Sequence, residues 1–256
     1  DNLVRLTREA GFPPDLVQIV HGGAEPALAL ARGRIDLLSF TGGPGAGLAL
    51  KRASGLVRCL MDLGGNDLLF VLPDADLYAA AATAVAHRFE IAGQSCAAVK
   101  KLYVHAAAQD DFTQRLLALV ADHRYGDPAE DATQMGTVID MAASADLAAR
   151  LAEAQAGGAR LLARGTAQGT LFAPTVIEKV PPAARLWASE TFGPVLTIRS
   201  FTDLDAAMAE VNATEFGLQA GIFTNDHAAI RRPSRGLQVG GVMVNEGPDF
   251  RAEHVP

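Results

Sequence analysis

The residue with the clearest chemical potential is a cysteine on a polar turn. Gly93-Gln94-Ser95-Cys96 follows a stretch that predicts a helix and precedes the apolar run 102–105. A cysteine on such a turn can be exposed, and backbone amides can stabilise its thiolate, so Cys96 is a candidate nucleophile. A lone cysteine is more often an inert buried residue, and Cys59, inside the apolar run 56–61, fits that description better.

A glycine-rich segment, residues 40–47, directly follows the apolar run 35–40. A turn that leads from a strand into a helix aims free backbone amides at a phosphate group. Glycine turns also join strands to helices for purely structural reasons, and this segment does not match the GxGxxG pattern. Both interpretations, a phosphate site and an ordinary connection, therefore stay open.

Two acidic residues lie where a reactive carboxylate could be placed. Asp62 begins the segment Asp62-Leu63-Gly64-Gly65-Asn66 after an apolar run, and α/β proteins place reactive groups at the ends of strands. The alternative is a cap on a helix or turn. Glu190 precedes the aromatic Phe192 by two residues, and by itself this segment predicts only a turn before a strand.

Composition and charge exclude several classes of protein. The chain has 256 residues and a formal net charge of −7, which argues against a nucleic-acid partner. No apolar run approaches the roughly 20 residues that span a bilayer, so we expect no membrane segment. Two cysteines are too few for a disulfide scaffold and fit a reducing cytoplasm. The six histidines lie singly, none at a ligand spacing, so we predict no metal site.

The order of apolar runs and helical stretches predicts a mainly parallel α/β sheet. Short runs with β-branched residues predict strands at residues 17–20, 35–40, 68–72, 102–105, 221–224 and 241–245. Longer periodic stretches predict helices at residues 77–89, 110–123, 145–156 and 204–211. The first 15 residues carry acidic side chains and no uninterrupted apolar core, so they predict the middle of a helix rather than a secretory leader.

Taken together and in this order, these segments resemble the aldehyde dehydrogenase superfamily over essentially the whole chain. In that family the phosphate turn reads Phe-Thr-Gly-Ser-x-x-x-Gly, and the general base lies in Glu-Leu-Gly-Gly-Lys or Glu-Leu-Gly-Gly-Asn. The nucleophile lies in Gly-Gln-x-Cys and the ribose ligand in Glu-x-Phe-Gly-Pro-Val. The corresponding positions here are Gly42, Asp62, Cys96 and Glu190, and the segment 214–218 also looks like the family's own.

The resemblance implies an aldehyde dehydrogenase-like three-layer α/β fold. Residues 1–64 would be the C-terminal part of a Rossmann-like NAD(P)-binding domain, and residues 65–256 a catalytic domain truncated at its C-terminal end. Family members run to nearly twice this length, so both ends look cut, and the segment with the asparagine of the oxyanion hole is missing. We therefore expect this chain alone to be inactive, and the full-length protein to be a cytoplasmic homodimer or homotetramer.

The resemblance also implies oxidation of a small aldehyde to a carboxylic acid, with NAD or NADP as cofactor. Cys96 would form a thiohemiacetal and then a thioester, its backbone amide would hold the oxyanion, and Asp62 would activate the hydrolytic water. Glu190 would bind the nicotinamide ribose, with Phe192 near the ring. The other residues implied in cofactor binding are Thr41, Gly42, Gly43, Ala46, Leu63 and Gly64. Those implied in substrate contact are Gln94, Ser95 and Arg251.

Three positions depart from the family pattern. Asp62 stands where the family usually has glutamate, so its carboxylate is one methylene shorter. Gly43 replaces a serine that usually donates a hydrogen bond, and Ile91 replaces an asparagine that usually precedes the cysteine by five residues. None of these changes removes the nucleophile.

Shorter segments of the sequence indicate the class of substrate, and two alternative functions stay open. Segments such as residues 135–140 look most like the branch that acts on lactaldehyde, phosphonoacetaldehyde and related small polar aldehydes. Arg251 lies in a loop at the family's substrate funnel, where it could pair with a carboxylate or phosphonate, or be a solvated surface arginine. Two alternatives remain: an acylating enzyme that uses coenzyme A, which the shortened Asp62 keeps open, and a non-catalytic truncated fragment.

Overall fold

The computed structural model describes residues 1–249, and the chain folds into two compact units, Asp1–Leu63 and Gly64–Pro256. The first unit is built on two parallel strands, β1 (Leu37–Gly42) and β2 (Arg58–Leu63), joined by helix α3 (Pro44–Ser54). Helices α1 (Asn2–Glu9) and α2 (Ala24–Arg32) precede these strands, and α2 packs against α3.

The glycine-rich segment 40–47 comprises the end of β1, the connecting residue Gly43 and the first turn of α3. Helix α3 has Pro44 in its first turn, where a missing N–H costs no helical hydrogen bond. Gly47 allows the helix to approach its strands closely, because a Cβ there would lie 2.7 Å from Leu63 Cδ2. The predicted strand-turn-helix arrangement is therefore confirmed.

The strand predicted at residues 17–20 is wrong. This segment has no regular secondary structure, and Ile19 and Val20 are 50% and 59% exposed. An apolar run forms a strand only where a neighbouring strand takes its backbone hydrogen bonds, and the sheet of this unit consists of β1 and β2 alone. The run therefore stays a connection between α1 and α2.

The second unit is built around a seven-stranded sheet with the order β11-β10-β3-β4-β9-β8-β5. All neighbouring strands are parallel except β5 and β8, as the sequence predicts for a mainly parallel sheet. The strands are β3 (Leu68–Val71), β4 (Lys101–His105), β5 (Arg160–Ala163), β8 (Thr175–Glu178), β9 (Val195–Phe201), β10 (Gln219–Phe223) and β11 (Gly241–Val244). A short hairpin, β6 (Ala167–Gln168) and β7 (Leu171–Phe172), lies apart from this sheet.

Aspartates begin several helices of this unit. Asp76 accepts hydrogen bonds from the backbone N–H groups of Tyr78 and Ala79, at 3.1 and 3.0 Å, and so caps α4. Asp140, Asp203 and Asp226 cap α6, α8 and α9 in the same way. The helices are α4 (Leu77–Phe89), α5 (Gln109–Asp122), α6 (Met141–Ala156), α7 (Arg185–Ala188), α8 (Leu204–Asn212) and α9 (His227–Gly236), with a 3-10 segment η1 (Glu90–Gly93) after α4.

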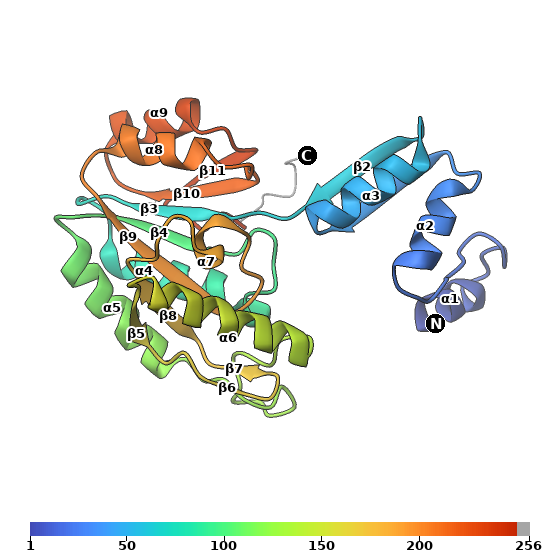
Figure 1. Ribbon diagram of the computed structural model, residues 1–256, viewed down its shortest axis with the longest axis horizontal. Helices are drawn as coiled ribbons and strands as arrows, with labels where there is room; N and C mark the ends of the chain where they lie inside the picture. Colours follow the sequence, from blue (N-terminus) through green and yellow to red (C-terminus); the bar gives the residue numbers. More distant parts are fainter. Residues whose placement is uncertain (250–256) are drawn as a thin grey trace. The chain divides into compact units, whose positions relative to one another are not determined.

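The direction of the crossovers explains why helices flank both faces of the sheet (Figure 1). Parallel strands are almost always joined by right-handed crossovers. The chain passes from β3 through α4 to β4 in one direction along the sheet, and from β9 through α8 to β10 in the other. Opposite directions with the same handedness place α4 and α8 on opposite faces. The predicted three-layer α/β architecture is thus confirmed for this unit.

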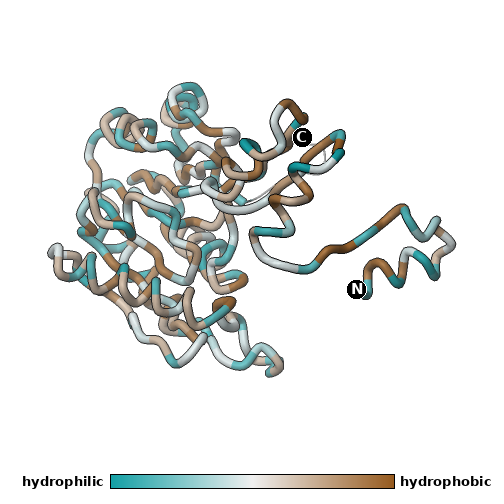
Figure 2. Tube along the Cα trace, turned by 45° about the vertical axis from the view of Figure 1, so that its right-hand side comes forward, coloured by the Kyte–Doolittle hydropathy of each residue, from teal (hydrophilic) through white to brown (hydrophobic). Residues whose placement is uncertain are grey.

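The core lies between the central strands and these helices. Every residue of β3 and β8 is buried, as expected for strands covered on both faces. Figure 2 shows hydrophobic segments in the interior of this unit. Tyr103 packs between Phe70 and Trp187, with ring centroids 5.2 and 5.7 Å away. These contacts hold β3, β4 and α7 in fixed positions relative to one another.

Candidate active site

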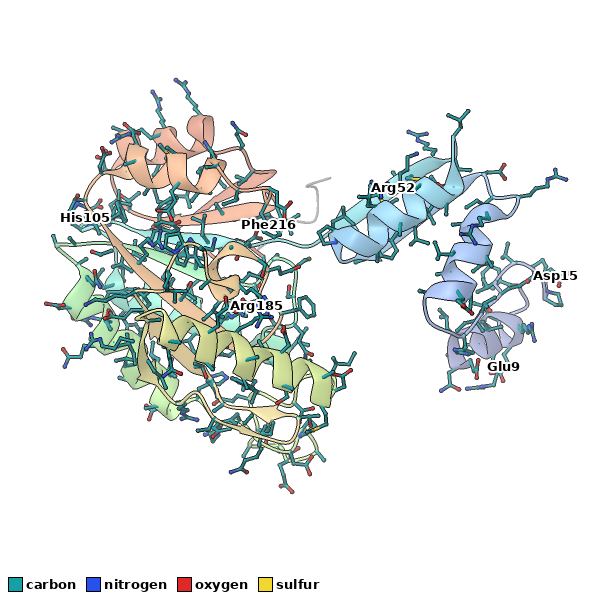
Figure 3. All side chains as sticks on the ribbon, in the orientation of Figure 1. Glu9, Asp15, Arg52, His105, Arg185 and Phe216 are labelled. Atoms are coloured by element: carbon teal, nitrogen blue, oxygen red, sulfur yellow. The ribbon has the colours of Figure 1, made fainter. Side chains whose placement is uncertain are left out.

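The loops before four parallel strands of the large sheet meet where these strands begin, at one end of the sheet. β3, β4, β9 and β10 begin in register, since Leu68 pairs with Lys101 and Ala220, and Lys101 pairs with Thr197. Residues 64–67, 94–100, 190–194 and 216–218, which precede these strands, therefore converge. Figure 3 shows Phe216 at the end of the sheet where these strands begin, and His105 at the opposite end.

The Cys96 turn begins with unusual backbone geometry. Ile91, Ala92 and Gly93 are all left-handed, with φ of 50°, 54° and 71°. A Cβ on Gly93 would lie 2.5 Å from Gly193 O, so the turn packs closely on the loop that follows Glu190. Cys96 itself is half-buried.

Gln94 and Ser95, predicted as substrate contacts, use their polar atoms within the protein. Gln94 Nε2 donates to Ile91 O at 2.9 Å and to Thr137 O at 3.3 Å, and Gln94 Oε1 accepts from Ile139 N at 2.7 Å. Ser95 Oγ accepts from the N–H of Ala97 at 3.3 Å. Both side chains thus brace the turn that contains Cys96.

The Gly64-Gly65 pair is needed because two groups of the site approach its backbone. A Cβ on Gly64 would overlap the Glu190 carboxylate, and a Cβ on Gly65 would lie 2.5 Å from Cys96 O. Gly65 N–H donates to Glu190 Oε1 at 3.2 Å. The structure therefore brings Gly64, Cys96 and Glu190 together, although they come from three distant segments.

The Glu190 loop is held from α6. Arg150 Nη1 donates to Ser189 Oγ at 2.8 Å and to Glu190 O at 3.0 Å. Arg150 also pairs with Asp146 at 2.6 Å, and Asp146 pairs with Arg185 of α7 at 2.9 Å. This network fixes the backbone at Glu190. Phe192, two residues further on, is 48% exposed, so its ring is accessible to a bound group.

Buried charges lie beneath these loops. Arg88 is fully buried, donates to Thr191 O at 2.9 Å and to Gly193 O, and has its pKa lowered by burial to about 9. Burial raises the pKa of Asp67 to about 7, although the Lys100 ammonium acts in the opposite direction. Lys100 lies 3.8 Å from Glu190, and burial lowers its pKa to about 8.

The remaining predicted residues of the first unit gather at the carboxyl ends of β1 and β2. Thr41 pairs with Asp62, and Gly42 pairs with Leu63, so these four residues are neighbours. Gly43 is the N-cap of α3 and Ala46 lies in its first turn. Side chains at Gly43 and Gly45 would meet nothing within 4 Å, so the turn leaves room for a phosphate at the free amides.

Three further expectations concern Arg251, a metal site and a membrane-spanning helix. Arg251 lies beyond the residues that the structure describes. Within residues 1–249, no group of three or more His, Cys, Asp or Glu side chains is arranged to hold a metal ion. In the same part of the chain, no helix has both the length and the apolar character needed to cross a bilayer.

Comparison with known proteins decides the family. Residues 2–256 match the model of the aldehyde dehydrogenase family. This chain belongs to the aldehyde dehydrogenase family. It is 36% identical over 255 residues to a sulfoacetaldehyde dehydrogenase of Neptuniibacter caesariensis, covering 99% of this chain and 56% of that protein.

Solved structures of aldehyde dehydrogenases agree with this assignment. An NADP-dependent glyceraldehyde-3-phosphate dehydrogenase of Bacillus halodurans, solved with NADP, superposes with a TM-score of 0.95 at 33% identity, over 99% of this chain and 54% of that one. A lactaldehyde dehydrogenase of Escherichia coli has a TM-score of 0.81 at 29% identity, over 85% of this chain and 47% of that one. The chain thus spans about half the length of these relatives.

Sequence reasoning missed the buried charged residues of this aldehyde dehydrogenase chain. Arg88 and the half-buried Arg150 lie in segments that predict helices, whereas Asp67 and Lys100 lie just before predicted strands. The one available signal was the charged character of Asp67 and Lys100 directly beside apolar strands, where a charge is buried only if it has partners. Periodicity alone could not say which partners these were.

The left-handed Ile91 leads to a stability prediction. A β-branched residue in this region costs roughly 1–2 kcal/mol, whereas asparagine adopts it readily. Ile91 is 66% exposed, so Ile91→Asn loses little buried surface. We expect it to raise the free energy of unfolding by about 1 kcal/mol, measured by urea titration of Trp187 fluorescence. Ile139→Asn is the control, because Ile139 is 81% exposed and has a negative φ. An equal gain in both variants would contradict the prediction.

Proposed function

We propose that the full-length protein containing this chain oxidises a small aldehyde to a carboxylic acid with NAD or NADP, through a covalent intermediate on Cys96. The observation that carries the proposal is the arrangement of the Cys96 turn, Gly65 and Glu190 at the amino-terminal ends of the central strands. There the Cys96 turn packs on Gly65, and Gly65 donates to the Glu190 carboxylate. A nucleophile and an acceptor for a cofactor hydroxyl group are thereby held in one place.

In the first step the Cys96 thiolate attacks the aldehyde carbon. A sulfur–carbon bond forms, and the electron pair of the carbonyl bond moves to oxygen, which gives a thiohemiacetal oxyanion. The backbone N–H of Cys96 donates to this oxygen and so stabilises the charge that develops there. The close packing of the turn on Gly65 and Gly193 keeps this N–H in a fixed position.

When bound, NAD or NADP supplies the two-electron oxidant that converts the thiohemiacetal into a thioester. The residues present fit such a group. Glu190 presents a carboxylate that is 17% exposed and can accept from a ribose hydroxyl, and the exposed Phe192 ring lies beside it in the chain. The free amides at Gly45 and Ala46 suit a phosphate, and Thr41, Gly42, Gly43, Leu63 and Gly64 complete the proposed cofactor residues.

In the last step Asp62 removes a proton from water as the water attacks the thioester carbon. The carbon–sulfur bond then breaks, the carboxylic acid leaves, and the Cys96 thiolate is restored. Asp62 is exposed at the end of β2, so a water molecule can reach its carboxylate.

The substrate that we propose is a small aldehyde with a polar or anionic group. The names of the relatives point to sulfoacetaldehyde, lactaldehyde and glyceraldehyde 3-phosphate as their substrates. Arg251 remains our candidate for pairing with a sulfonate, carboxylate or phosphate on such an aldehyde.

The two cysteines provide the test. In the full-length protein, Cys96→Ala is expected to abolish NAD(P)H formation from sulfoacetaldehyde or lactaldehyde, because no covalent intermediate can form. Cys59→Ala is the matched control and should retain the parental rate, since Cys59 Sγ lies against Val57 O at 3.3 Å within the first unit. Activity that survives in Cys96→Ala, measured by absorbance of NAD(P)H, would refute the proposal.

A further inference from the structure

Lys100 is buried directly beneath the nucleophile turn. Its side chain is 2% exposed, and its Nζ donates to Ser95 O at 2.8 Å and to Cys96 O. The backbone of Lys100 is held on both sides, because its N–H donates to Asp67 O at 2.9 Å and its carbonyl accepts from Thr197 N–H at 3.1 Å. The neighbouring segments of β3 and β9 therefore determine where the ammonium lies.

These contacts set the direction of a peptide group in the turn. In a trans peptide the C=O and the N–H point in opposite directions. The Ser95 carbonyl points toward Lys100 Nζ, so the Cys96 N–H of the same peptide points away from the lysine. Under the proposed function, this N–H donates to the oxyanion.

We infer that Lys100 is a positioning residue of the active site, which orients the Cys96 amide and connects the nucleophile turn to Glu190. Lys100 Nζ lies 3.8 Å from Glu190 Oε1, the carboxylate that we propose as the ribose ligand. A single ammonium group thus contacts the turn that holds the oxyanion and the residue that holds the cofactor. This inference rests on the proposed function.

Lys100 also acts electrostatically on the Cys96 thiol. Burial and the Arg88 guanidinium lower the pKa of Lys100, and Asp67, Glu190 and Cys96 raise it, with a result of about 8. Coupling between two charges is reciprocal, so the protonated lysine favours the Cys96 thiolate. This effect is present below about pH 8 and is lost as the pH rises through that value.

Alkylation of Cys96 tests the inference on this chain itself. Lys100→Met has a similar length but neither the charge nor the N–H donors. We expect iodoacetamide to modify Cys96 about 3 to 10 times more slowly at pH 7, and the rise of the rate with pH to move to higher pH, because fewer thiolates form. Cys59, followed in the same peptide digest, should react at the parental rate.

Lys101→Met is the matched control. Lys101 is 4% exposed and burial lowers its pKa to about 8, but its Nζ lies over the Trp187 ring, 4.6 Å from the centroid. This variant should leave Cys96 alkylation unchanged. If Lys100→Met does not fold, Lys100→Gln decides, since it keeps an N–H donor without the charge and should also slow alkylation. Parental alkylation in the folded Lys100 variant, or equal slowing in Lys101→Met, would overturn the inference.

Kinetics of the full-length protein separate the inference from the proposed function. Lys100→Met should lower the rate of the first NAD(P)H burst by roughly 10 to 100-fold with little change in the KM for aldehyde, because one oxyanion donor is misdirected. Lys100→Arg, which restores a charge and donors, should recover part of the rate. A burst at the parental rate in Lys100→Met would overturn the inference. A parent protein that oxidises no aldehyde would refute the proposed function, while the alkylation result would still decide whether Lys100 controls the nucleophile turn.

Discussion

Replacing Asp62 with alanine in the full-length protein is expected to leave the first round of aldehyde oxidation intact and to stop turnover at the Cys96 thioester. Thiolate attack and the two-electron oxidation need no base at Asp62, whereas hydrolysis needs one to activate water. Losing a general base costs roughly 100 to 10,000-fold in the step that it serves. The steady rate should therefore fall by about 100-fold or more, with the burst amplitude unchanged.

Stopped-flow absorbance of NAD(P)H and the mass of the trapped protein measure this outcome. The acyl group should appear as added mass on the peptide that contains Cys96. Asp36→Ala is the control, because Asp36 is an exposed acid just before β1 in the same unit, and it should turn over at the parental rate.

Asp62→Glu tests the same carboxylate from the opposite direction. Glutamate, the residue that the family resemblance predicts here, moves the carboxylate by roughly 1.5 Å, a displacement that can change a geometry-limited rate by up to about 100-fold. We expect a higher steady rate and an unchanged burst. If Asp62→Ala turns over as fast as the parent, Asp62 is not the base. Coenzyme A should then be added as the acyl acceptor, since faster turnover would favour the acylating alternative.

Gly65→Ala is expected to lower the rate of the NAD(P)H burst by about 100-fold, because a displacement on the order of 1 Å at a reacting group can cost that much. The new methyl group would lie 2.5 Å from the carbonyl oxygen of Cys96, which is backbone and cannot rotate away. The Cys96 turn must therefore shift, and the Cys96 N–H shifts with it.

Substitutions at two other glycines show whether the slower burst is specific to the contact between Gly65 and Cys96 O. Gly64→Ala meets only the end of the flexible Glu190 side chain, so it should mainly raise the KM for NAD(P). Gly126→Ala is the matched control, since its closest neighbour, Thr133 Oγ1, is 3.4 Å away, and it should retain the parental rate. Thermal unfolding of all three variants is measured in parallel. A parental burst in Gly65→Ala would contradict the role that we propose for this contact in catalysis.

Much of the fold is predictable because its elements are encoded locally. Helix α4 spans the predicted residues because Asp76 caps it and an alanine-rich face follows. The strand β3 is an uninterrupted apolar run because both faces of the sheet are covered, and β4 has an apolar centre between Lys101 and His105. The run at residues 17–20 has the same local pattern, but it forms no strand because no neighbouring strand pairs with it.

The residues of the candidate site are predictable to the extent that they lie in short motifs. Cys96, Asp62 and Glu190 are identified by the segments that contain them, and their roles stay predictions. Lys100 and Arg88 are not, because a charged residue beside an apolar run looks the same in sequence whether it is solvated or buried. Only its partners distinguish the two cases.

By itself, the sequence determined the α/β class, the order of most elements and the family, since periodicity and motifs are properties of neighbouring residues. The tertiary structure decided which distant groups meet. Gly65 and Glu190 are 125 positions apart, and they form a hydrogen bond only because the parallel strands β3 and β9 begin at the same edge of the sheet. The buried Lys100 joins the Cys96 turn to Glu190 for the same physical reason: the register of parallel strands, which no local pattern specifies, sets the neighbours of each loop.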